Sequence, residues 1–123
     1  MGAPLSATRP QARDKRAFLL ASRLLDAHPS RQSLAAIGHA FIDEPMESNL
    51  DCPTCLTDAV GALLDRLDWD HEDLLRMKPA LIRAGIKRKA VGDFERGRIV
   101  HVNGWLLGET EVRLCTVAAL HVT

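Results

Sequence analysis

The fold is decided by residues 99–122, which read IVHVNGWLLGETEVRLCTVAALHV. The first part of this stretch consists of two apolar runs on either side of Asn103-Gly104. An Asn-Gly pair between such runs favours a two-residue hairpin turn, because both turn positions need a positive φ that Asn and Gly tolerate. The sequence therefore predicts a β-hairpin over residues 98–107. The expected cross-strand pairs are Val102 with Trp105, Val100 with Leu107, and His101 with Leu106.

The residues that follow the hairpin predict a buried last helix. Gly108 is expected to break the second strand. Glu109 and Glu111 then place negative charge in the first helical turn, where the helix dipole favours it. From Val112 onward the segment is apolar nearly all round, with Arg113 as its only charge. A helix that is apolar on every side has to be buried, either in its own domain or against another chain.

Upstream of the hairpin, apolar residues recur at steps of three and four, which is the spacing of one helix face. The predicted helices cover residues 12–27, a short stretch with Leu34, Ile37 and Phe41, a stretch from Pro53 in its first turn to about Leu67, a short helix capped by Asp70, and residues 79–91 with a ragged end between Gly92 and Gly97. We predict a mainly α fold: a compact bundle of five or six helices with one C-terminal β-hairpin preceding a buried last helix. Residues 1–11 are expected to form a flexible tail and residues 12–123 a single helical domain.

The composition is that of an ordinary globular protein. A chain of 123 residues with 46% hydrophobic and 26% charged residues buries about two-thirds of its unfolded surface, so it needs no disulfide or metal to fold. No apolar run approaches the roughly 20 residues of a membrane helix, so we expect no membrane partner. The start of the chain lacks a signal-peptide core, which favours a cytoplasmic location as written. A trimmed mature start would instead indicate the periplasm.

Charge is segregated along the chain although the formal net charge is zero. Residues 9–31 carry a basic excess, residues 43–73 carry ten acids against Arg66 alone, and residues 76–98 carry eight bases against Asp93 and Glu95. One interpretation is that neighbouring helices of opposite sign pack together and neutralise each other. The other is that separate basic and acidic faces steer a binding partner electrostatically.

Cys52 and Cys55 have the spacing of redox and zinc motifs at the start of a predicted helix, where the dipole lowers a thiol pKa. A thioredoxin-type site follows a β-strand, and residues 45–51 are not strand-like. Zinc would need Cys115 and a histidine as further ligands, without a second Cys-x-x-Cys pair. We therefore predict no metal and no cofactor, and a cysteine pair that is either without chemistry or an incidental disulfide.

Catalytic patterns are missing from the sequence. The histidines are scattered, and none lies four residues from another on one helix face. No glycine-rich phosphate loop and no local Ser, His and acid signature is present. We predict that the chain is not an enzyme.

The basic segment is a candidate for binding DNA. Helix 79–91 followed by the hairpin resembles a recognition helix and a wing-like element, with Arg83, Lys87 and Arg88 placed to contact phosphates. Two features argue against this interpretation. The break before Pro79 is shorter than a normal helix-turn-helix turn, and the hairpin tip has neither Lys nor Arg.

The C-terminal part also carries a family resemblance. Residues 93–120 contain Asp93-Phe94, Gly97-Arg98, Val100, Val102-Asn103-Gly104-Trp105, Leu107, Thr110-Glu111, Arg113-Leu114-Cys115 and Ala118-Ala119-Leu120. This string resembles the closing segment of small, uncharacterised bacterial proteins exported by the twin-arginine route, and it covers about a quarter of the chain. The resemblance implies a noncatalytic role as a small companion of an exported oxidoreductase.

Together these patterns predict a noncatalytic protein-binding or accessory protein, a small subunit or a module that modulates a partner. Its partner is another protein, with an oxidoreductase as the class that the resemblance implies. Trp105, Trp69 and Phe94 are the expected apolar anchors, and Trp105 is also expected to anchor the hairpin. The expected charged contacts are Arg83, Lys87 and Arg88. The alternative is a small DNA-binding regulator that uses helix 79–91 and the hairpin.

Overall fold

The computed structural model of the chain describes residues 12–28, 30–43 and 52–121. Its elements are α2 (Ala12–Asp26), α3 (Arg31–Asp43), α4 (Leu56–Leu67), α5 (His71–Arg76), α6 (Pro79–Glu95), β1 (Ile99–Val102), β2 (Trp105–Gly108) and α7 (Glu109–His121). The predicted fold class is confirmed: the described part is mainly helical, with a two-stranded hairpin immediately before the last helix. The predicted tail, residues 1–11, lies outside the described residues.

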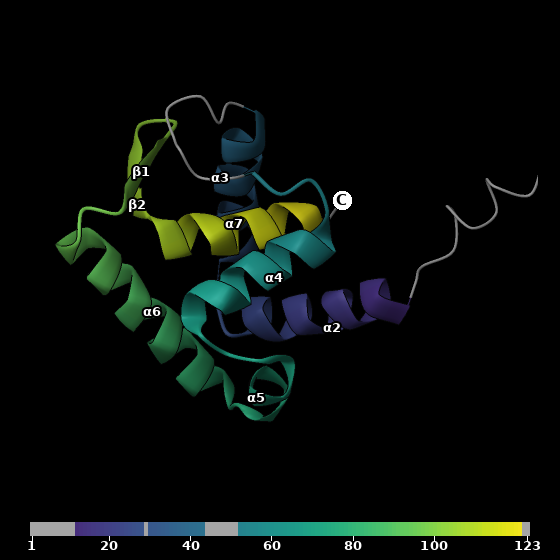
Figure 1. Ribbon diagram of the computed structural model, residues 1–123. Coiled ribbons are helices and arrows are strands. Elements are labelled where there is room, and N and C mark those ends of the chain that lie inside the picture. The colour runs from purple at the N-terminus through teal and green to yellow at the C-terminus, as the bar shows by residue number, and fades with distance from the viewer. Residues whose placement is uncertain (1–11, 29, 44–51, 122–123) are drawn as a thin grey trace, which may run out of the picture.

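Helix α7 forms the centre of the bundle. Figure 1 shows it running through the middle of the molecule, with α4 in front of it and α3 behind. Most of its residues are buried, including Val112, Leu114 and Val117. The predicted buried last helix is therefore confirmed, and the neighbours that bury it belong to this chain.

Two clusters of apolar side chains make the core. The larger cluster joins α2, α4 and α7 and is extended by Leu74 of α5 and by Ile82 and Ile86 of α6. The smaller cluster lies under the hairpin and consists of Phe41, Val100, Val102, Leu107 and Val112. Within the described ranges no helix is long and apolar enough to cross a membrane.

The hairpin has the predicted register. Val102 pairs with Trp105, and the two turn residues have the positive φ values expected of an Asn-Gly turn, 50° at Asn103 and 86° at Gly104. The second strand ends at Gly108, as predicted, and Gly108 itself still pairs with Ile99 as the last residue of β2. A side chain at Gly108 would come within 3.1 Å of the Asp93 Cβ, so the glycine allows α6 to lie directly against the strand.

Trp105 does not anchor the hairpin to the core. Its side chain is 60% exposed at the tip of the hairpin, beside a shallow hollow of about 110 Å³ against α3. Val100, Val102 and Leu107 hold the hairpin instead, because they are the residues that enter the smaller core cluster.

One predicted helix boundary was wrong. Helix α4 begins at Leu56 rather than with Pro53 in its first turn, because Cys55 is extended and its carbonyl accepts the first helical hydrogen bond, from Ala59. Helix α6 continues past residue 91 and ends at Glu95, within the predicted ragged end between Gly92 and Gly97, and buried contacts of Asp93 hold its last turn. The predicted cap of α5 is confirmed, because the Asp70 side chain accepts a hydrogen bond from the Asp73 amide at 2.7 Å.

We expect Gly104→Val to destabilise the protein by about 1 kcal/mol or more, because a β-branched residue resists positive φ. No atom lies within 4 Å of a Cβ built at Gly104, so the loss would report backbone strain rather than a clash. Thermal unfolding followed by circular dichroism measures it. Gly104→Asn is the matched control and should cost less, since Asn tolerates the left-handed region. An unchanged melting temperature for Gly104→Val would contradict the turn.

Candidate functional site

Helix α6 packs one stripe of side chains against the core, and its surface is exposed on both sides of that stripe. At 100° per residue, its buried residues Ile82, Ile86 and Ala90 fall on one stripe. Arg83 and Phe94 lie on the flank to one side of this stripe, and Gly85 and Gly92 lie on the other. A hollow runs along each flank, and the two hollows have different chemistry.

The first flank lines an apolar groove of about 460 Å³ between α6, α3 and α7. Apolar side chains form most of its wall: Leu34, Ile37, Ile86, Ala90, Val91, Phe94, Leu107 and Leu114. Val91 is 51% exposed and Phe94 42% exposed, although both adjoin this wall. Exposed apolar side chains beside an open apolar groove leave surface that a partner can bury. We refer to this feature as the apolar groove.

Two cations lie on the rim of the apolar groove at the end where α2 meets α3. Arg83 Nε donates a hydrogen bond of 2.9 Å to the Ala27 carbonyl, which orients its guanidinium. Lys87 forms no ion pair with any described acid. At the other end, nearer the hairpin, the Glu111 carboxylate accepts a hydrogen bond from the Gly108 amide at 3.0 Å. The groove is therefore cationic at one end only.

His28 lies on the same rim without adding positive charge at neutral pH. Burial lowers its pKa, and the nearby Arg83 guanidinium lowers it further. Its hydrogen bond to the Leu24 carbonyl, 3.0 Å from Nδ1, acts in the opposite direction and does not outweigh these effects. The charge at this end of the groove therefore comes from Arg83 and Lys87.

The second flank of α6 lines a hollow of about 570 Å³ that we call the basic hollow. Trp69, from the segment between α4 and α5, forms one wall, and Arg88, Lys89 and Arg96 supply its positive charge. A Cβ at Gly85 would lie 2.4 Å from Cζ2 of Trp69, so the indole touches the backbone of α6 there. Glu95 is the acid in the lining.

The residues that the sequence singled out thus fall on three surfaces. Phe94, Arg83 and Lys87 line the apolar groove, Trp69 and Arg88 line the basic hollow, and Trp105 stands apart at the hairpin tip. Sequence reasoning missed Val91 and the α3 residues opposite it. Val91 could have been predicted, because it follows Arg83 and Lys87 at four-residue steps and so shares their helix face. The α3 residues could not, because tertiary packing places them opposite α6.

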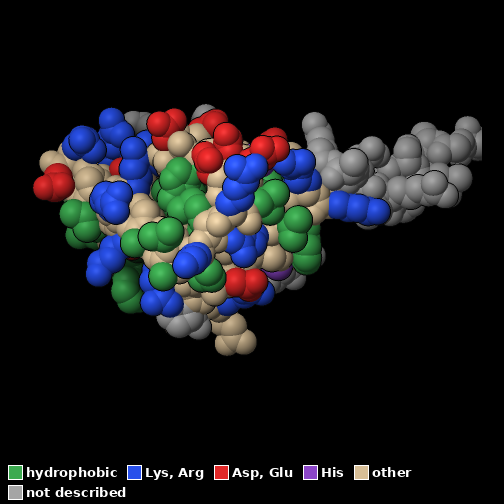
Figure 2. Space-filling view, turned by 90° about the horizontal axis from the view of Figure 1, so that it is seen from below, with side chains coloured by type: hydrophobic (Ala, Val, Ile, Leu, Met, Phe, Trp, Pro, Cys, Tyr) green, Lys and Arg blue, Asp and Glu red, His purple; other side chains and the backbone are tan. Residues whose placement is uncertain are grey.

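The segregated charges do not neutralise each other by contact. Among the described residues, no acid of segment 58–73 and no base of segment 76–98 takes part in an ion pair. Figure 2 shows most acidic side chains of one face along its upper edge, with others at the left end and in the lower centre among the Lys and Arg side chains. Helices of opposite sign are therefore not joined by direct ion pairs among these residues, and electrostatic steering of a partner stays a prediction.

Asp93 is the most deeply buried acid that the structure describes. Its Oδ1 accepts a hydrogen bond from Arg66 Nη2 at 2.6 Å, and its Oδ2 accepts one from the Thr110 amide at 2.8 Å. Burial alone would raise the pKa of this carboxyl, but the Thr110 and Arg66 contacts outweigh burial and the pKa is lowered. Arg66 also lies 3.2 Å from Glu109. This cluster ties α4, α6 and α7 together, which is a structural role.

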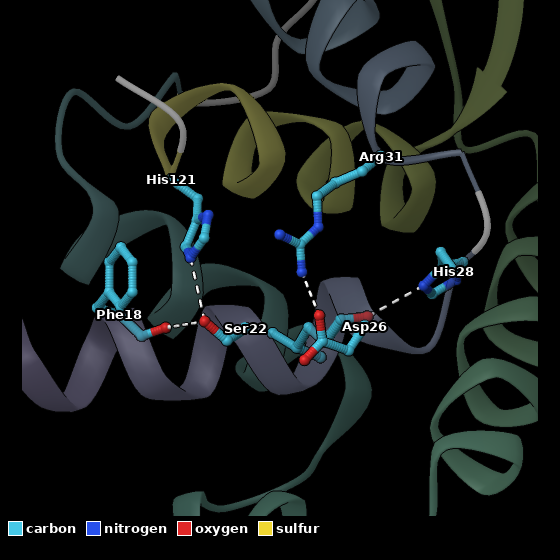
Figure 3. A network of polar contacts seen from close by, with 7 residues as sticks. Phe18, Ser22, Asp26, His28, Arg31 and His121 are labelled. Atoms are coloured by element: carbon cyan, nitrogen blue, oxygen red, sulfur yellow. Dashed lines mark hydrogen bonds and ion pairs between the residues drawn. The ribbon is translucent and has the colours of Figure 1, made fainter.

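A second polar network joins α2 to the end of α7 and the start of α3 (Figure 3). The His121 ring stacks on Phe18 with centroids 4.3 Å apart, and its Nε2 lies 3.1 Å from the Ser22 hydroxyl. Arg31 forms an ion pair with Asp26. Burial and the Arg31 charge lower the pKa of His121, while Asp26 raises it less. The network fastens the end of the central helix.

Cys52 and Cys115 do not have the lowered thiol pKa of a reactive cysteine. Burial raises the pKa of Cys52, against a lowering by Arg113, and burial together with Glu111 raises the pKa of Cys115 to about 12. A reactive thiol needs a lowered pKa, so both shifts have the wrong sign. In the part of the chain that the structure describes, no three His, Cys, Asp or Glu side chains are grouped as metal ligands would be. The absence of a bound metal stays a prediction.

No family model, curated protein or solved structure matches this chain. The resemblance of residues 93–120 to twin-arginine-exported proteins stays a prediction.

Proposed function

We propose that this chain is a noncatalytic protein-binding protein that receives an apolar segment of its partner in the apolar groove. The observation that carries the proposal is the exposure of Val91 and Phe94 beside a groove whose wall is already apolar. Covering them removes apolar area from water, which is the main favourable contribution to most protein association. A few anchor side chains, often aromatic, commonly contribute most of the binding energy of a protein interface.

A short amphipathic helix fits the dimensions of the groove. Arg83 and Phe94 are separated by about 16 Å along α6, at 1.5 Å per residue. Apolar side chains at positions i, i+4 and i+7 of a partner helix span about 10 Å, so three anchors fit between these residues. The cationic end of the groove, with Arg83 and Lys87, then favours an acidic residue at one end of that helix.

The charge pattern along the chain is a second feature that supports an accessory, partner-binding role. Unpaired bases on α6 and unpaired acids before it create opposite potentials on one small molecule, which accelerate and orient encounter with a complementary partner. An oxidoreductase remains the partner class implied by the resemblance of the C-terminal segment. The proposal does not depend on that class.

Duplex DNA is the alternative partner, since Arg83, Lys87 and Arg88 are all exposed on α6. Arg83 and Lys87 lie on one flank, however, and Arg88 lies on the outward side of the helix beside the acidic Glu95, so the three bases do not form one row that could follow a phosphate backbone. The hairpin tip also lacks a basic residue for a phosphate. These placements favour the protein partner.

Site-specific photo-crosslinking in the source cells tests the proposal. A photoreactive residue at Val91, in the apolar groove, should capture a protein, whereas the same residue at Leu81, 58% exposed on the other flank, should not capture it. Binding of that purified protein should weaken at least about tenfold with Phe94→Ala and stay within about twofold with Arg88→Ala.

Two outcomes would contradict protein binding at the groove. One is a captured protein that appears equally at both positions or whose affinity ignores Phe94→Ala. The other is submicromolar binding of random duplex DNA at physiological salt that is lost when Arg83, Lys87 and Arg88 are changed together to Ala. Such binding should weaken steeply with salt, because neutralised phosphates release counterions, and it would favour the DNA regulator.

A further inference from the structure

The basic hollow is larger than the apolar groove, and the proposed docking of a protein segment does not use it. Its volume of about 570 Å³ lies in the range of small-molecule sites, roughly 300–1,000 Å³. It opens on the flank of α6 opposite the apolar groove, so a ligand there would leave the groove free. Its lining combines an aromatic wall with several cations.

The aromatic wall is held in place by the backbone of α6. Trp69 packs against Gly85, and Met77 and Leu81 continue the apolar surface beside it. In the described parts of the chain no group accepts a hydrogen bond from the indole N–H. The half-buried indole therefore lines the hollow with apolar ring surface and with an N–H that has no acceptor among the described residues.

The cations lie on either side of Gly92, which has no side chain to separate them. Arg88 and Arg96 are two turns apart, about 12 Å along the axis, with Gly92 one turn from each. The Arg96 guanidinium folds back to within 3.1 Å of the position that a Gly92 Cβ would occupy. Lys89 adds a third positive charge, and none of the three forms an ion pair with a described acid.

We propose that the basic hollow binds a single nucleotide, with the base against Trp69 and the phosphates between Arg88 and Arg96. Bases stack or pack on indole surfaces whatever their sequence, and guanidinium groups bind phosphate oxygens through paired hydrogen bonds. A bare anion would leave the apolar wall unused, and a purely apolar ligand would leave three cations unpaired. The nucleotide is either free in solution or an unpaired residue of a single strand.

The two tryptophans of the chain make a direct test available. Trp105→Phe removes the exposed indole at the hairpin tip and leaves Trp69 as the only fluorophore of its kind. Titration of this variant with each common ribonucleoside triphosphate should change the Trp69 emission and saturate at micromolar to low millimolar concentration. Adenosine and inorganic triphosphate should each bind at least about tenfold more weakly than ATP, because each lacks half of the recognised chemistry.

Matched variants on the two flanks of α6 locate the site. Arg88→Ala together with Arg96→Ala should weaken nucleotide binding at least about tenfold, whereas Arg83→Ala together with Lys87→Ala should change it by less than about twofold. All four side chains are on α6 or its cap, and circular dichroism melts verify that both double variants fold. Phe94→Ala should bind nucleotide normally, so failure of this proposal and failure of protein docking are distinguishable.

A five-residue single-stranded RNA separates the two sources of the ligand. If the RNA binds more than about tenfold tighter than the free nucleotides, the natural ligand is a single strand. If it binds equally or more weakly, the natural ligand is a free nucleotide. The proposal is overturned if no nucleotide changes Trp69 emission in the millimolar range, if inorganic triphosphate binds as well as ATP, or if the Arg88 and Arg96 double variant binds as the parent does.

Discussion

Gly38→Ala is expected to destabilise the protein by about 3 kcal/mol or more, at the upper end of what overpacking costs. A Cβ at Gly38 would lie 2.0 Å from the carbonyl oxygen of Cys115 and 2.9 Å from the Ala119 Cβ. The nearest obstacle is helix backbone, which cannot rotate away as a long side chain can. The substitution therefore has to push α3 off the central helix α7 or prevent their contact.

Gly61→Ala is the matched control, since Gly61 also lies inside a helix, α4, but has no atom within 4 Å of a built Cβ. Alanine is preferred to glycine in helix interiors, so this variant should gain about 0.5–1 kcal/mol. Denaturant unfolding of both variants, followed by far-ultraviolet circular dichroism, measures the difference. A loss below about 1 kcal/mol for Gly38→Ala would mean that α3 and α7 do not cross in contact at this residue.

Asp93→Ala should cost about 3 kcal/mol, because it leaves the Arg66 guanidinium with only Glu109 and leaves the Thr110 amide without its acceptor. The Asp93 side chain is 2% exposed and that of Arg66 17%, so water replaces the lost carboxylate poorly. The exposed pair of Arg31 and Asp26 supplies the control, and Asp26→Ala should cost less than about 1 kcal/mol. Equal losses in the two variants would contradict a buried role for Asp93.

The lowered pKa of Asp93 also leads us to expect that the free energy of unfolding changes with pH. Since the pKa of Asp93 is lower in the folded protein than in the unfolded chain, the unfolded chain takes up the proton first as the pH falls. The stability that this carboxyl contributes is complete above the ordinary Asp pKa of about 4 and is lost as the pH falls below it. Denaturant unfolding across this window should show a smaller loss for Asp93→Ala than for the parent protein.

Local features of the fold were predictable where neighbouring residues alone settle the conformation. The Asn103-Gly104 turn sets the register of the hairpin, because positive φ at both positions suits few other pairs. Asp70 caps α5 through its own side chain, and Pro79 begins α6 at a position where no amide is needed. The sequence also placed the end of α6 between Gly92 and Gly97, and contacts of Asp93 with α4 and α7 hold the last turn, which ends at Glu95.

The candidate site was predictable in its residues but not in their grouping. Arg83, Lys87 and Phe94 share a helical stripe that periodicity reveals, and they do line one groove. Trp69 and Arg88 looked like further contacts for the same partner, yet they line a different hollow on the opposite flank. Which flank a residue occupies depends on which side of α6 faces the core. Ile82 and Ile86 mark that side, but only the packed structure shows that they, and not other apolar residues of the helix, are buried.

The sequence by itself determined the helical class, the hairpin register and the burial of the last helix. Helical periodicity, turn conformation and a helix that is apolar nearly all round are each set by residues close together in the chain. Tertiary structure alone decided that Gly38 marks a helix crossing, that Gly108 lies directly against α6 and that Asp93 joins three helices. It also decided that α6 separates an apolar groove from a basic hollow. The physical reason is that close approach and burial depend on residues far apart in the chain, whose contacts no local pattern encodes.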